Sequence, residues 1–474
     1  MWFRRDLRID DNTALSEACA QAKQVIPVYV FDTAVLSKLE DRDDAKVTYM
    51  HRSLSELSRR LRGEGSALLV RVGEPVAEIP RLADRLGAAT VFVNADYDPD
   101  SKRRDAEIAE ALAADGRSLE RYKDIVVYEP TEIVSRSGEP YTLFTPYLRA
   151  WLARLALDAE NGEDPAGEKR ANTERLARAM DFEPYGAGWG FEELGFRQNP
   201  LVTEAGEGDA HRRFARFLER IDRYVEERDF PAAEATSGLS TALRFGTISI
   251  RTLVRAVRER EGEGSRKWLS ELVWREFFHM ILDRFPRVVE GAFHREFSAL
   301  RWPGNIEHFE AWRDGRTGYP LIDASMRCLR ETGWLHNRLR MAAASFLVKD
   351  LLLDWRLGEA WFAHCLLDHD IAANNGGWQW CASTGADAQP YFRVFNPVLQ
   401  SRKYDPEGRF IRRFCPELSA FPRELIHWPH AADADAQRRA GCRLGTDYPH
   451  PIVDHRESKE RAIRLYRAAR AGAA

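Results

Sequence analysis

The 474-residue sequence lacks an apolar run long enough to cross a membrane, and its first six residues (MWFRRD) are charged almost at once. A spanning helix needs about 20 apolar residues and a signal peptide needs an apolar core, so neither is expected. The six cysteines include no CxxC pair. Scattered cysteines favour reduced thiols over a disulfide framework or a zinc site. The sequence therefore predicts a cytoplasmic protein with no membrane segment and no metal.

Two motifs that bind phosphates are also missing, and the charges nearly balance. No GxGxxG and no GxxxxGK[ST] follows a β-rich run, which excludes the two standard phosphate loops. The 70 Lys and Arg face 74 Asp and Glu, for a formal charge of -4. A near-neutral chain can still bind nucleic acid through a local basic patch, because salt confines the field of a charge to roughly 10 Å. The 13 tryptophans, concentrated after residue 260, suit stacked bases and flat ligands as well as large cores.

The first part of the sequence alternates helical and strand-like patterns. In chain order these cover 12–22 (helix), 24–31 (strand), 48–62 (helix), 67–72 (strand), 75–86 (helix) and 90–94 (strand). Such alternation predicts a parallel, Rossmann-like α/β sheet. We expect this domain to span residues 1–125.

The rest of the sequence predicts a linker followed by an all-α domain. Residues 126–200 are rich in loop residues such as NGEDPAG and YGAGWG, which favours an interdomain linker. From 201 to 474 helical periodicity dominates, at 211–227, 247–261, 267–284, 321–332, 336–355 and 358–369.

Two of these helices carry mixed polar and aromatic faces. Glu271, Trp274 and Arg275 have i, i+3 and i+4 spacing and so share one face. Asn337 and Met341 do the same on a later helix. An acid, an amide, a cation and aromatic rings on such faces can grip a planar polar ligand. The plain alternative is an amphipathic helix with a surface ion pair, worth about 0.2–0.5 kcal/mol.

Two further segments draw attention by their composition. The run 367–380 (LDHDIAANNGGWQW) holds acids, amides, glycines and two tryptophans, and local helix preference cannot explain it, because Asn and Gly disfavour helices. The Asp-His-Asp of this run lacks the further ligands that a metal site needs. One of its aspartates could instead pair with an arginine, and such a pair could flank a cofactor. The run 236–240 (TSGLS) precedes a helix and could donate to a pyrophosphate or simply cap that helix.

Taken in order, the four segments resemble the photolyase/cryptochrome flavoprotein family, most closely its class I branch that acts on cyclobutane pyrimidine dimers. The opening WFRRDLRIDDN (2–12) is similar to the start of that family, and NNGGWQW (374–380) is highly specific for it. The resemblance covers essentially the whole chain. It implies an N-terminal α/β domain, a long linker and an all-α C-terminal domain that binds FAD, in agreement with the organisation above.

The resemblance also implies individual roles. It assigns FAD contacts to Tyr224, Thr236, Ser237, Gly238, Leu239, Ser240, Trp268, Arg275, Arg340, Asp368, Asp370 and Asn374. It assigns the dimer pocket to Glu271, Trp274, Asn337, Met341 and Trp380, and the flavin N5 position to Asn374. The chain that photoreduces the flavin corresponds to Trp302, Trp355 and Trp378. Further DNA contacts fall on Arg228, Arg275, Arg338 and Arg393.

What the resemblance implies about activity is light-driven repair. Excited FADH⁻ donates an electron to a flipped-out dimer in UV-damaged DNA, the dimer splits, and the electron returns. The (6-4) photolyases have two histidines where Asn337 and Met341 stand, and cryptochromes often replace Asn374, so repair of cyclobutane dimers is favoured over a (6-4) photolyase or a blue-light photoreceptor. The absence of a long tail after residue 453 points the same way. Asp100, Ser101 and Glu290 disfavour a folate antenna and leave a deazaflavin, a second flavin or no antenna open. The family expectation is a monomer.

Overall fold

The computed structural model describes residues 1–202 and 204–472, which fall into two compact units. The first unit comprises residues 1–222 and 237–286, and the second comprises 223–236 and 287–474. The segment 223–236 thus belongs with the C-terminal part of the chain although first-unit residues flank it on both sides. The predicted domain boundaries at 125 and 200 stay a prediction. None of the helices within the described residues is both long and apolar enough to span a membrane.

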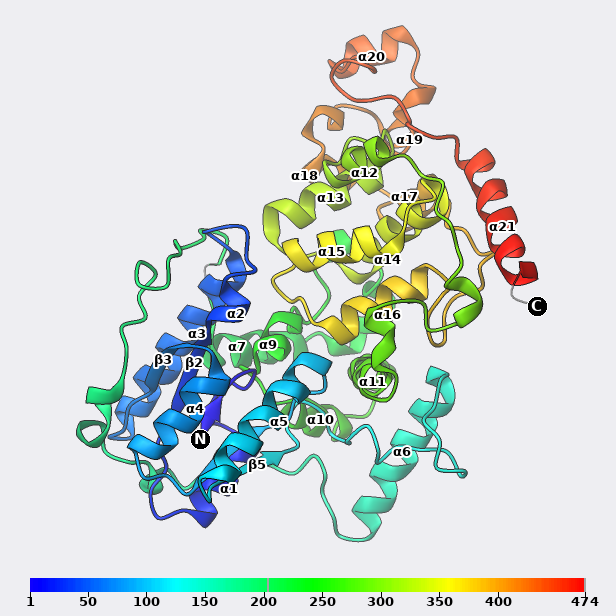
Figure 1. The fold of residues 1–474 in the computed structure, drawn as a ribbon. Coiled ribbons are helices and arrows are strands. Elements are labelled where there is room, and N and C mark those ends of the chain that lie inside the picture. The colour runs from blue at the N-terminus through cyan, green and yellow to red at the C-terminus, as the bar shows by residue number, and fades with distance from the viewer. Residues whose placement is uncertain (203, 473–474) are drawn as a thin grey trace. The chain divides into compact units, whose positions relative to one another are not determined.

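A parallel sheet forms the centre of the N-terminal half of the first unit (Figure 1). Its strands run in the order β3-β2-β1-β4-β5, with bounds β1 (Trp2–Phe3), β2 (Val28–Asp32), β3 (Leu69–Gly73), β4 (Thr90–Asn94) and β5 (Ser118–Tyr122). The three predicted strands are confirmed, whereas β1 and β5 are additional. β5 escapes prediction because its sequence, SLERY, is too polar to read as a buried strand.

Alternation along the strands divides the sheet into two apolar faces. Phe3, Tyr29 and Phe31 pack in one core cluster together with α1 (Thr13–Gln21) and α3 (Ala45–Gly63). Their sequence neighbours, such as Trp2 and Val30, pack on the other face against α4 (Pro75–Arg85) and α5 (Pro99–Ala114). Because successive strand side chains point to opposite faces, both faces need a helical cover. The predicted Rossmann-like fold is confirmed.

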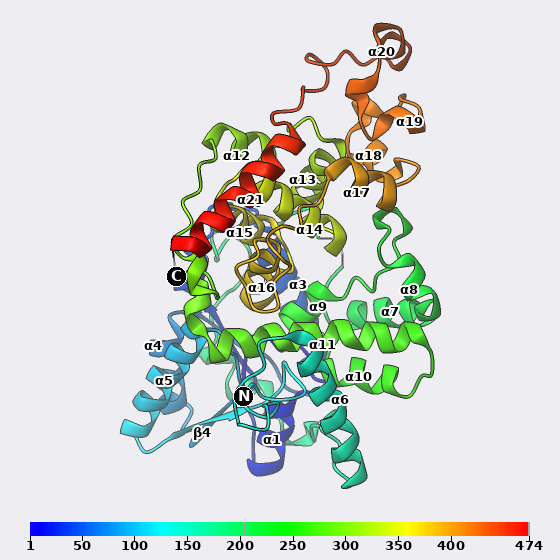
Figure 2. The ribbon, with the colours of Figure 1, turned by 90° about the vertical axis from the view of Figure 1, so that its right-hand side faces the viewer.

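The first unit has further helices, of which α11 is the longest. They are α2 (Thr33–Leu36), α6 (Phe144–Glu160), α7 (Glu207–Leu218), α9 (Ser240–Phe245), α10 (Ile250–Arg258) and α11 (Glu263–Arg284). Figure 2 shows α10 and α6 beside α11, in agreement with their direct contacts. The helix α6 lies inside the stretch 126–200, so 17 of the 75 residues of the expected linker are α-helical.

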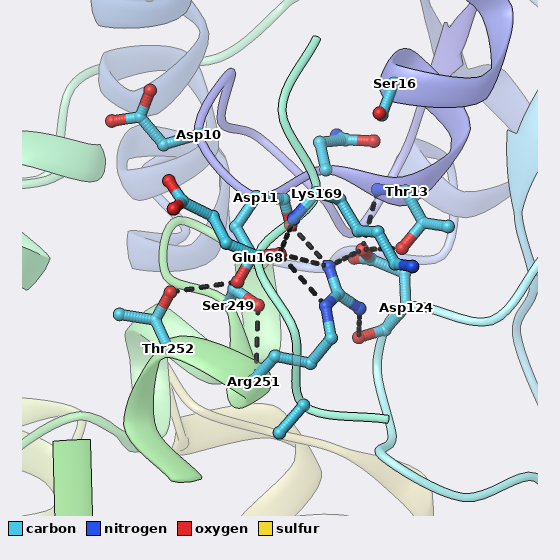
Figure 3. Close-up of polar contacts among 12 residues, drawn as sticks. Asp10, Asp11, Thr13, Ser16, Asp124, Glu168, Lys169, Ser249, Arg251 and Thr252 are labelled. Atoms are coloured by element: carbon cyan, nitrogen blue, oxygen red, sulfur yellow. Dashed lines mark hydrogen bonds and ion pairs between the residues drawn. The ribbon is translucent and has the colours of Figure 1, made fainter. Parts of the chain in front are cut away.

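A buried ionic network fastens α10 to the sheet side of the first unit (Figure 3). Arg251 Nε donates to Asp11 Oδ1 at 3.0 Å, and its Nη2 donates to Asp124 Oδ1 at 2.9 Å. Arg8 Nη2 also donates to Asp124, at 2.7 Å. Burial raises the pKa of Asp124, but the two guanidinium charges outweigh burial and lower the pKa to about 2. The network therefore holds both carboxylates ionised at neutral pH.

The named secondary-structure elements in the described residues of the second unit are all helices, joined by loops. Its helices are α8 (Tyr224–Glu227), α12 (Ile306–Arg313), α13 (Pro320–Thr332), α14 (Asn337–Ser345), α15 (Trp355–Cys365), α16 (Ile371–Cys381), α17 (Pro397–Tyr404), α18 (Arg409–Phe414), α19 (Arg423–Ile426), α20 (Ala434–Ala440) and α21 (His455–Gly472). One large core cluster joins α13, α14, α15 and α16. The predicted all-α character of the C-terminal region is confirmed.

Two local expectations are wrong. The run ANNGG lies inside α16 and does not interrupt it, because Asp370 caps the helix by accepting from Ala372 N and Ala373 N. The expected single helix 336–355 is divided into α14, a π-helical turn at Phe346–Asp350 and a non-helical stretch before α15. The buried Lys349 lies in that turn and donates to Ser383 Oγ and Arg393 O, at 3.0 and 2.9 Å. Local propensity is outweighed at the first place by this cap together with the hydrogen bonds of Asn374 and Asn375 to Glu359 and Val288. At the second place it is outweighed by the tertiary hydrogen bonds of Lys349.

Candidate functional site

The mixed face predicted on α11 exists in the first unit. Glu271 and Trp274 are both half-buried, and Glu271 Oε1 lies 3.1 Å from Lys267 Nζ, one turn earlier. The Trp274 ring stacks on Phe144 with centroids 3.7 Å apart and an interplanar angle of 12°. This stacking covers one face of the indole and fixes its plane. α11 therefore presents a carboxylate beside an immobilised aromatic ring.

Glu276, on the same helix, is a polar residue that the sequence reading left unassigned. It lies on the apolar stripe of α11 and is fully buried. Its carboxylate accepts from Val127 N at 2.7 Å, Tyr128 N at 3.0 Å and Trp151 Nε1 at 2.6 Å. Burial raises the pKa of Glu276 to about 7, against the effect of these three donors. No sequence motif marks this role, because the three donors lie more than a hundred residues away along the chain.

Trp268 and residues 237–240 are further candidates in the first unit, whereas Thr236, which precedes them, belongs to the second unit. Trp268 is buried, and its ring centroid lies 5.8 Å from Phe214 and 4.9 Å from Phe217. Gly238 has φ +64°, a conformation that favours glycine, while the space around its α-carbon is open. The backbone conformation therefore requires glycine at position 238. Because this residue is exposed and has no side chain, the backbone just before α9 is uncovered there.

In the second unit, the N-terminus of α14 presents the predicted pair of Asn337 and Met341. Asn337 Nδ2 lies 3.8 Å from Met341 Sδ, so the two side chains meet on one helix face as their spacing predicted. His336 caps the helix, its Nδ1 accepting from Arg338 N at 3.1 Å. Burial lowers the pKa of His336 to about 4, so the ring is neutral at physiological pH. The histidine is thus a structural cap.

The predicted Arg–Asp pair forms beside it. Arg340 Nη2 donates to Asp368 Oδ2 at 2.7 Å, and Arg340 Nε donates to Leu335 O at 2.7 Å. The side chain of Asp368 is only 2% exposed. Its other oxygen, Oδ1, is buried and has no hydrogen-bond partner among the described residues. An unpaired buried carboxylate oxygen is costly, so this site has an acceptor that a bound polar ligand would satisfy.

Asn374 and Asn375 attach α16 to its surroundings. Asn374 Nδ2 donates to the carbonyl of Glu359 at 3.1 Å, and Asn375 Nδ2 donates to Glu359 Oε1 at 2.9 Å and to Val288 O at 3.0 Å. Burial raises the pKa of Glu359 to about 7. Because Asn374 Nδ2 is held by a backbone carbonyl on α15, the orientation of this amide is fixed by the fold.

The three tryptophans predicted for electron transfer share one core cluster. Trp355 and Trp378 are buried in it, and Trp302 packs against it half-buried. Gly358 makes the approach of α15 and α16 possible, because a Cβ there would overlap the Trp378 ring. Trp302 is thus the one of the three that reaches solvent. Trp380, predicted for the dimer pocket, is half-buried on the same helix as Trp378.

The arginines predicted to contact DNA are not equivalent. Arg393 is exposed and Arg228 is half-buried. Arg338 Nη2 donates to Asp229 Oδ1 at 2.8 Å. Arg275 Nη1, in the first unit, donates to Ile125 O at 2.5 Å. Their predicted roles, like those of the other site residues, stay predictions.

The residues fit an FAD cofactor in chemical type. In the second unit the buried Asp368 oxygen, the half-buried Arg340 and the fixed amide of Asn374 are a donor and acceptor set for a flavin ring edge. In the first unit the glycine-bearing run before α9 leaves backbone exposed for a diphosphate. The assignment of these groups to FAD comes from the resemblance.

Comparison with known proteins gives the same result along the whole chain. Residues 1–166 match the family model "DNA photolyase", and residues 268–468 match "FAD binding domain of DNA photolyase". A deoxyribodipyrimidine photo-lyase of Halobacterium salinarum is 39% identical, covering 99% of this chain and 98% of the relative.

Two solved structures are also similar. A class III photolyase from Agrobacterium tumefaciens superposes with a TM-score of 0.86 at 36% identity, over 99% of this chain and 97% of that one. An archaeal photolyase from Sulfolobus tokodaii, solved with two FAD molecules, superposes with a TM-score of 0.82 at 32% identity, over 98% and 99%.

Proposed function

The chain belongs to the photolyase/cryptochrome family, and we propose that it repairs cyclobutane pyrimidine dimers in UV-damaged DNA by light-driven electron transfer from reduced FAD. The observation that carries the proposal is the α14 site. There the Arg340–Asp368 pair has one unpartnered carboxylate oxygen, next to a helix face that offers Asn337 and Met341. When bound, reduced FAD supplies the electron that opens the dimer on excitation.

The chain's own residues bind and orient, and none needs to act as a nucleophile. Asp368 accepts a hydrogen bond from the cofactor, and Arg340 compensates the charge of this buried carboxylate. Asn374 offers its amide, whose orientation Glu359 O fixes, to the flavin N5 region. Trp302, Trp355 and Trp378 carry electrons to an oxidised flavin. The geometry matches cofactor chemistry in which the protein positions and tunes.

The substrate is a dimer turned out of the helix. Glu271 and Asn337 hydrogen-bond its base edges and stabilise the added charge, while Trp274 and Trp380 contact its apolar faces. Asn337 and Met341 stand where (6-4) photolyases have two histidines, which favours the cyclobutane dimer. Turning out a base costs a few kcal/mol, and a dimer, already poorly stacked, costs least. We propose that the protein acts as a monomer, with Arg228, Arg338 and Arg393 contacting phosphates.

A light-harvesting chromophore is a further part of the proposal. The family's α/β domain is confirmed here as a parallel sheet of five strands. The archaeal relative was solved with two FAD molecules. We propose that any antenna chromophore of this protein is a flavin or a deazaflavin rather than a folate.

The experiment that tests the assignment of the pocket is a Glu271→Ala variant. Loss of a charge-assisted hydrogen bond to the substrate should lower the repair yield of the reduced enzyme about tenfold, while FAD content is unchanged. Glu263→Ala is the matched control, because Glu263 is an exposed acid in the first turn of the same helix. Equal repair by both variants would remove Glu271 from the pocket.

A further inference from the structure

The segment 223–236 is tied to the rest of the second unit by side chains near Asp229. Asp229 Oδ1 accepts from Arg338 Nη2 at 2.8 Å, which links the segment to the first turn of α14. Phe230 contacts Tyr404 at the end of α17, with ring centroids 6.5 Å apart. The side chains of Arg338 and Asp229 are 19% and 36% exposed, so their ion pair is partly shielded from water. Asp229 thus holds the residue that directly follows Asn337.

Two arginines lie near this one carboxylate, and a lysine shares an aromatic ring with one of them. Arg338 lies over the Tyr404 ring at 4.4 Å, and Lys403 Nζ lies over the same ring at 5.1 Å. Arg228 Nε lies 3.9 Å from Asp229 Oδ1, and its guanidinium lies 5.3 Å over the Tyr224 ring. Cations at these distances are attracted to the ring faces, so each arginine has a defined position. The cluster therefore has a net positive charge that a single acid only partly offsets.

The guanidinium of Arg338 is oriented but not saturated. Its Nη2 is used for Asp229, and its Nε is buried without a hydrogen-bond partner among the described residues. A guanidinium has five donors in a planar fork, which matches the oxygens of a phosphate. Asp229 thus both presents this fork and competes with a phosphate for it.

We propose that Asp229 is a specificity-determining residue, which makes DNA binding at this cluster selective for damaged DNA. The inference rests on the proposed function. Undamaged DNA is bound almost entirely through phosphates, so a carboxylate among the cations weakens that binding directly. Damaged DNA gains in addition from Asn337, whose position depends on the neighbouring Arg338 being held by Asp229. Specificity is the difference between the affinities for damaged and undamaged DNA. The Asp229 carboxylate raises the first and lowers the second.

The test is an Asp229→Asn variant, assayed in the dark with two oligothymidines that differ only in one cyclobutane dimer. Affinity for the undamaged strand should rise about threefold, and the ratio of damaged to undamaged affinity should fall about tenfold. In repair assays of the reduced enzyme, KM should rise while kcat is unchanged, because the lost interaction is one of binding. Asp229→Glu should restore the ratio.

Glu234→Gln is the matched control. Glu234 lies on the same segment, its carboxylate pairs with Arg413 at 3.4 Å, and both side chains are mostly exposed. The substitution changes the net charge by the same amount as Asp229→Asn, so it isolates the effect of charge alone. If Glu234→Gln lowers the ratio as much as Asp229→Asn, or if Asp229→Asn moves both affinities in parallel, the proposal is wrong.

A double-mutant cycle keeps the test valid if the single variant is poorly folded. In an Arg338→Gln background, Asp229→Asn should have no further effect on the affinity ratio, whereas additive effects would contradict the proposal. Failure of the proposed function looks different. The unaltered protein would then bind both strands equally, or fail to repair in light, before any substitution is made.

Discussion

Two buried carboxylates, one in each unit, differ in how completely the protein satisfies them. Glu276 accepts three hydrogen bonds, from Val127 N, Tyr128 N and Trp151 Nε1, all supplied by the chain. Asp368 has an ion pair on Oδ2 and no partner on Oδ1 among the described residues. We infer that the first is a structural lock, whereas the second keeps an acceptor for the proposed cofactor. Asp350 Oδ2 is also buried without a partner among the described residues, so the unpaired oxygen supports the assignment of Asp368 only together with the family resemblance.

The largest expected effect is at the ligand site. Asp368→Asn should weaken FAD binding about tenfold to a hundredfold, because the variant loses a charge-assisted hydrogen bond and leaves Arg340 without its anion. The free energy of unfolding of the cofactor-free protein should fall less than in Glu276→Gln, because the side chain of Arg340 is 27% exposed and water can solvate its charge. FAD content by absorbance and thermal unfolding of the FAD-free protein measure the two quantities. If FAD is retained at the level of the unaltered protein, the comparison with Glu276 fails.

The opposite pattern, a loss of stability with FAD binding retained, is expected for a substitution of Glu276. Glu276→Gln should lower the free energy of unfolding by about 2–3 kcal/mol at pH 6, because the amide NH₂ group cannot accept from the buried donors. FAD affinity should stay within about twofold of the unaltered protein, a difference of less than 1 kcal/mol. Denaturant unfolding and FAD titration measure these, and a loss of FAD without a loss of stability would reverse the assignment.

The pH dependence of stability sharpens the same comparison. Burial raises the pKa of Glu276 from 4.5 to about 7, so the folded state binds the proton more tightly than the unfolded state. The stability that this contributes, up to about 3 kcal/mol, is present below pH 4.5 and is lost as the pH rises through about 7. The stability gap between the unaltered protein and Glu276→Gln should therefore narrow from pH 5 to 8. A gap that widens would contradict the assigned shift.

A smaller effect, on photoreduction of the flavin and not on repair, is expected for a substitution of the half-buried Trp302. Trp302→Phe should slow photoreduction of oxidised flavin about tenfold, or about 1.4 kcal/mol, because phenylalanine is much harder to oxidise. Repair by chemically reduced enzyme should be unchanged. Flash photolysis and a repair assay separate the two. Photoreduction at the original rate would take Trp302 out of the electron-transfer chain.

The smallest effect is expected at the partner of Glu271. Lys267 Nζ lies 3.1 Å from Glu271 Oε1 on the exposed side of α11. Such i,i+4 pairs contribute about 0.2–0.5 kcal/mol. Lys267→Gln should therefore lower the free energy of unfolding by no more than about 0.5 kcal/mol and change the repair yield by no more than about twofold. A loss as large as that of Glu271→Ala would mean that Lys267 itself contacts the substrate.

The sequence predicts residues well where local pattern and tertiary structure agree. The α11 helix, expected over 267–284, spans Glu263–Arg284, and its Glu271 and Trp274 share the predicted face. Prediction from the sequence fails where residues distant along the chain determine the local structure. The ANNGG run is helical because Asn374 and Asn375 donate to Glu359 and Val288, far along the chain. The π-helical turn, likewise, contains a lysine whose partners, Ser383 and Arg393, follow it by dozens of residues.

The same limit explains which site residues were missed. Glu276 looked like one more charge in WREFF, and only the positions of Val127, Tyr128 and Trp151 reveal its role. Asp229 carried no motif at all, and its significance comes from Arg338 lying 2.8 Å away. Gly238 was among the predicted FAD contacts, but the reason for a glycine there, a positive φ, comes only from the structure. Partners that are distant along the chain cannot be deduced from spacing.

The most direct test of the central claim is light-dependent recovery of absorbance near the thymine band. The assay uses UV-irradiated oligothymidine and the purified protein with its flavin chemically reduced. The account predicts recovery under blue light and none in darkness. No recovery in blue light, with FAD bound and reduced, would contradict repair of cyclobutane dimers and would direct attention to a (6-4) substrate or to light sensing.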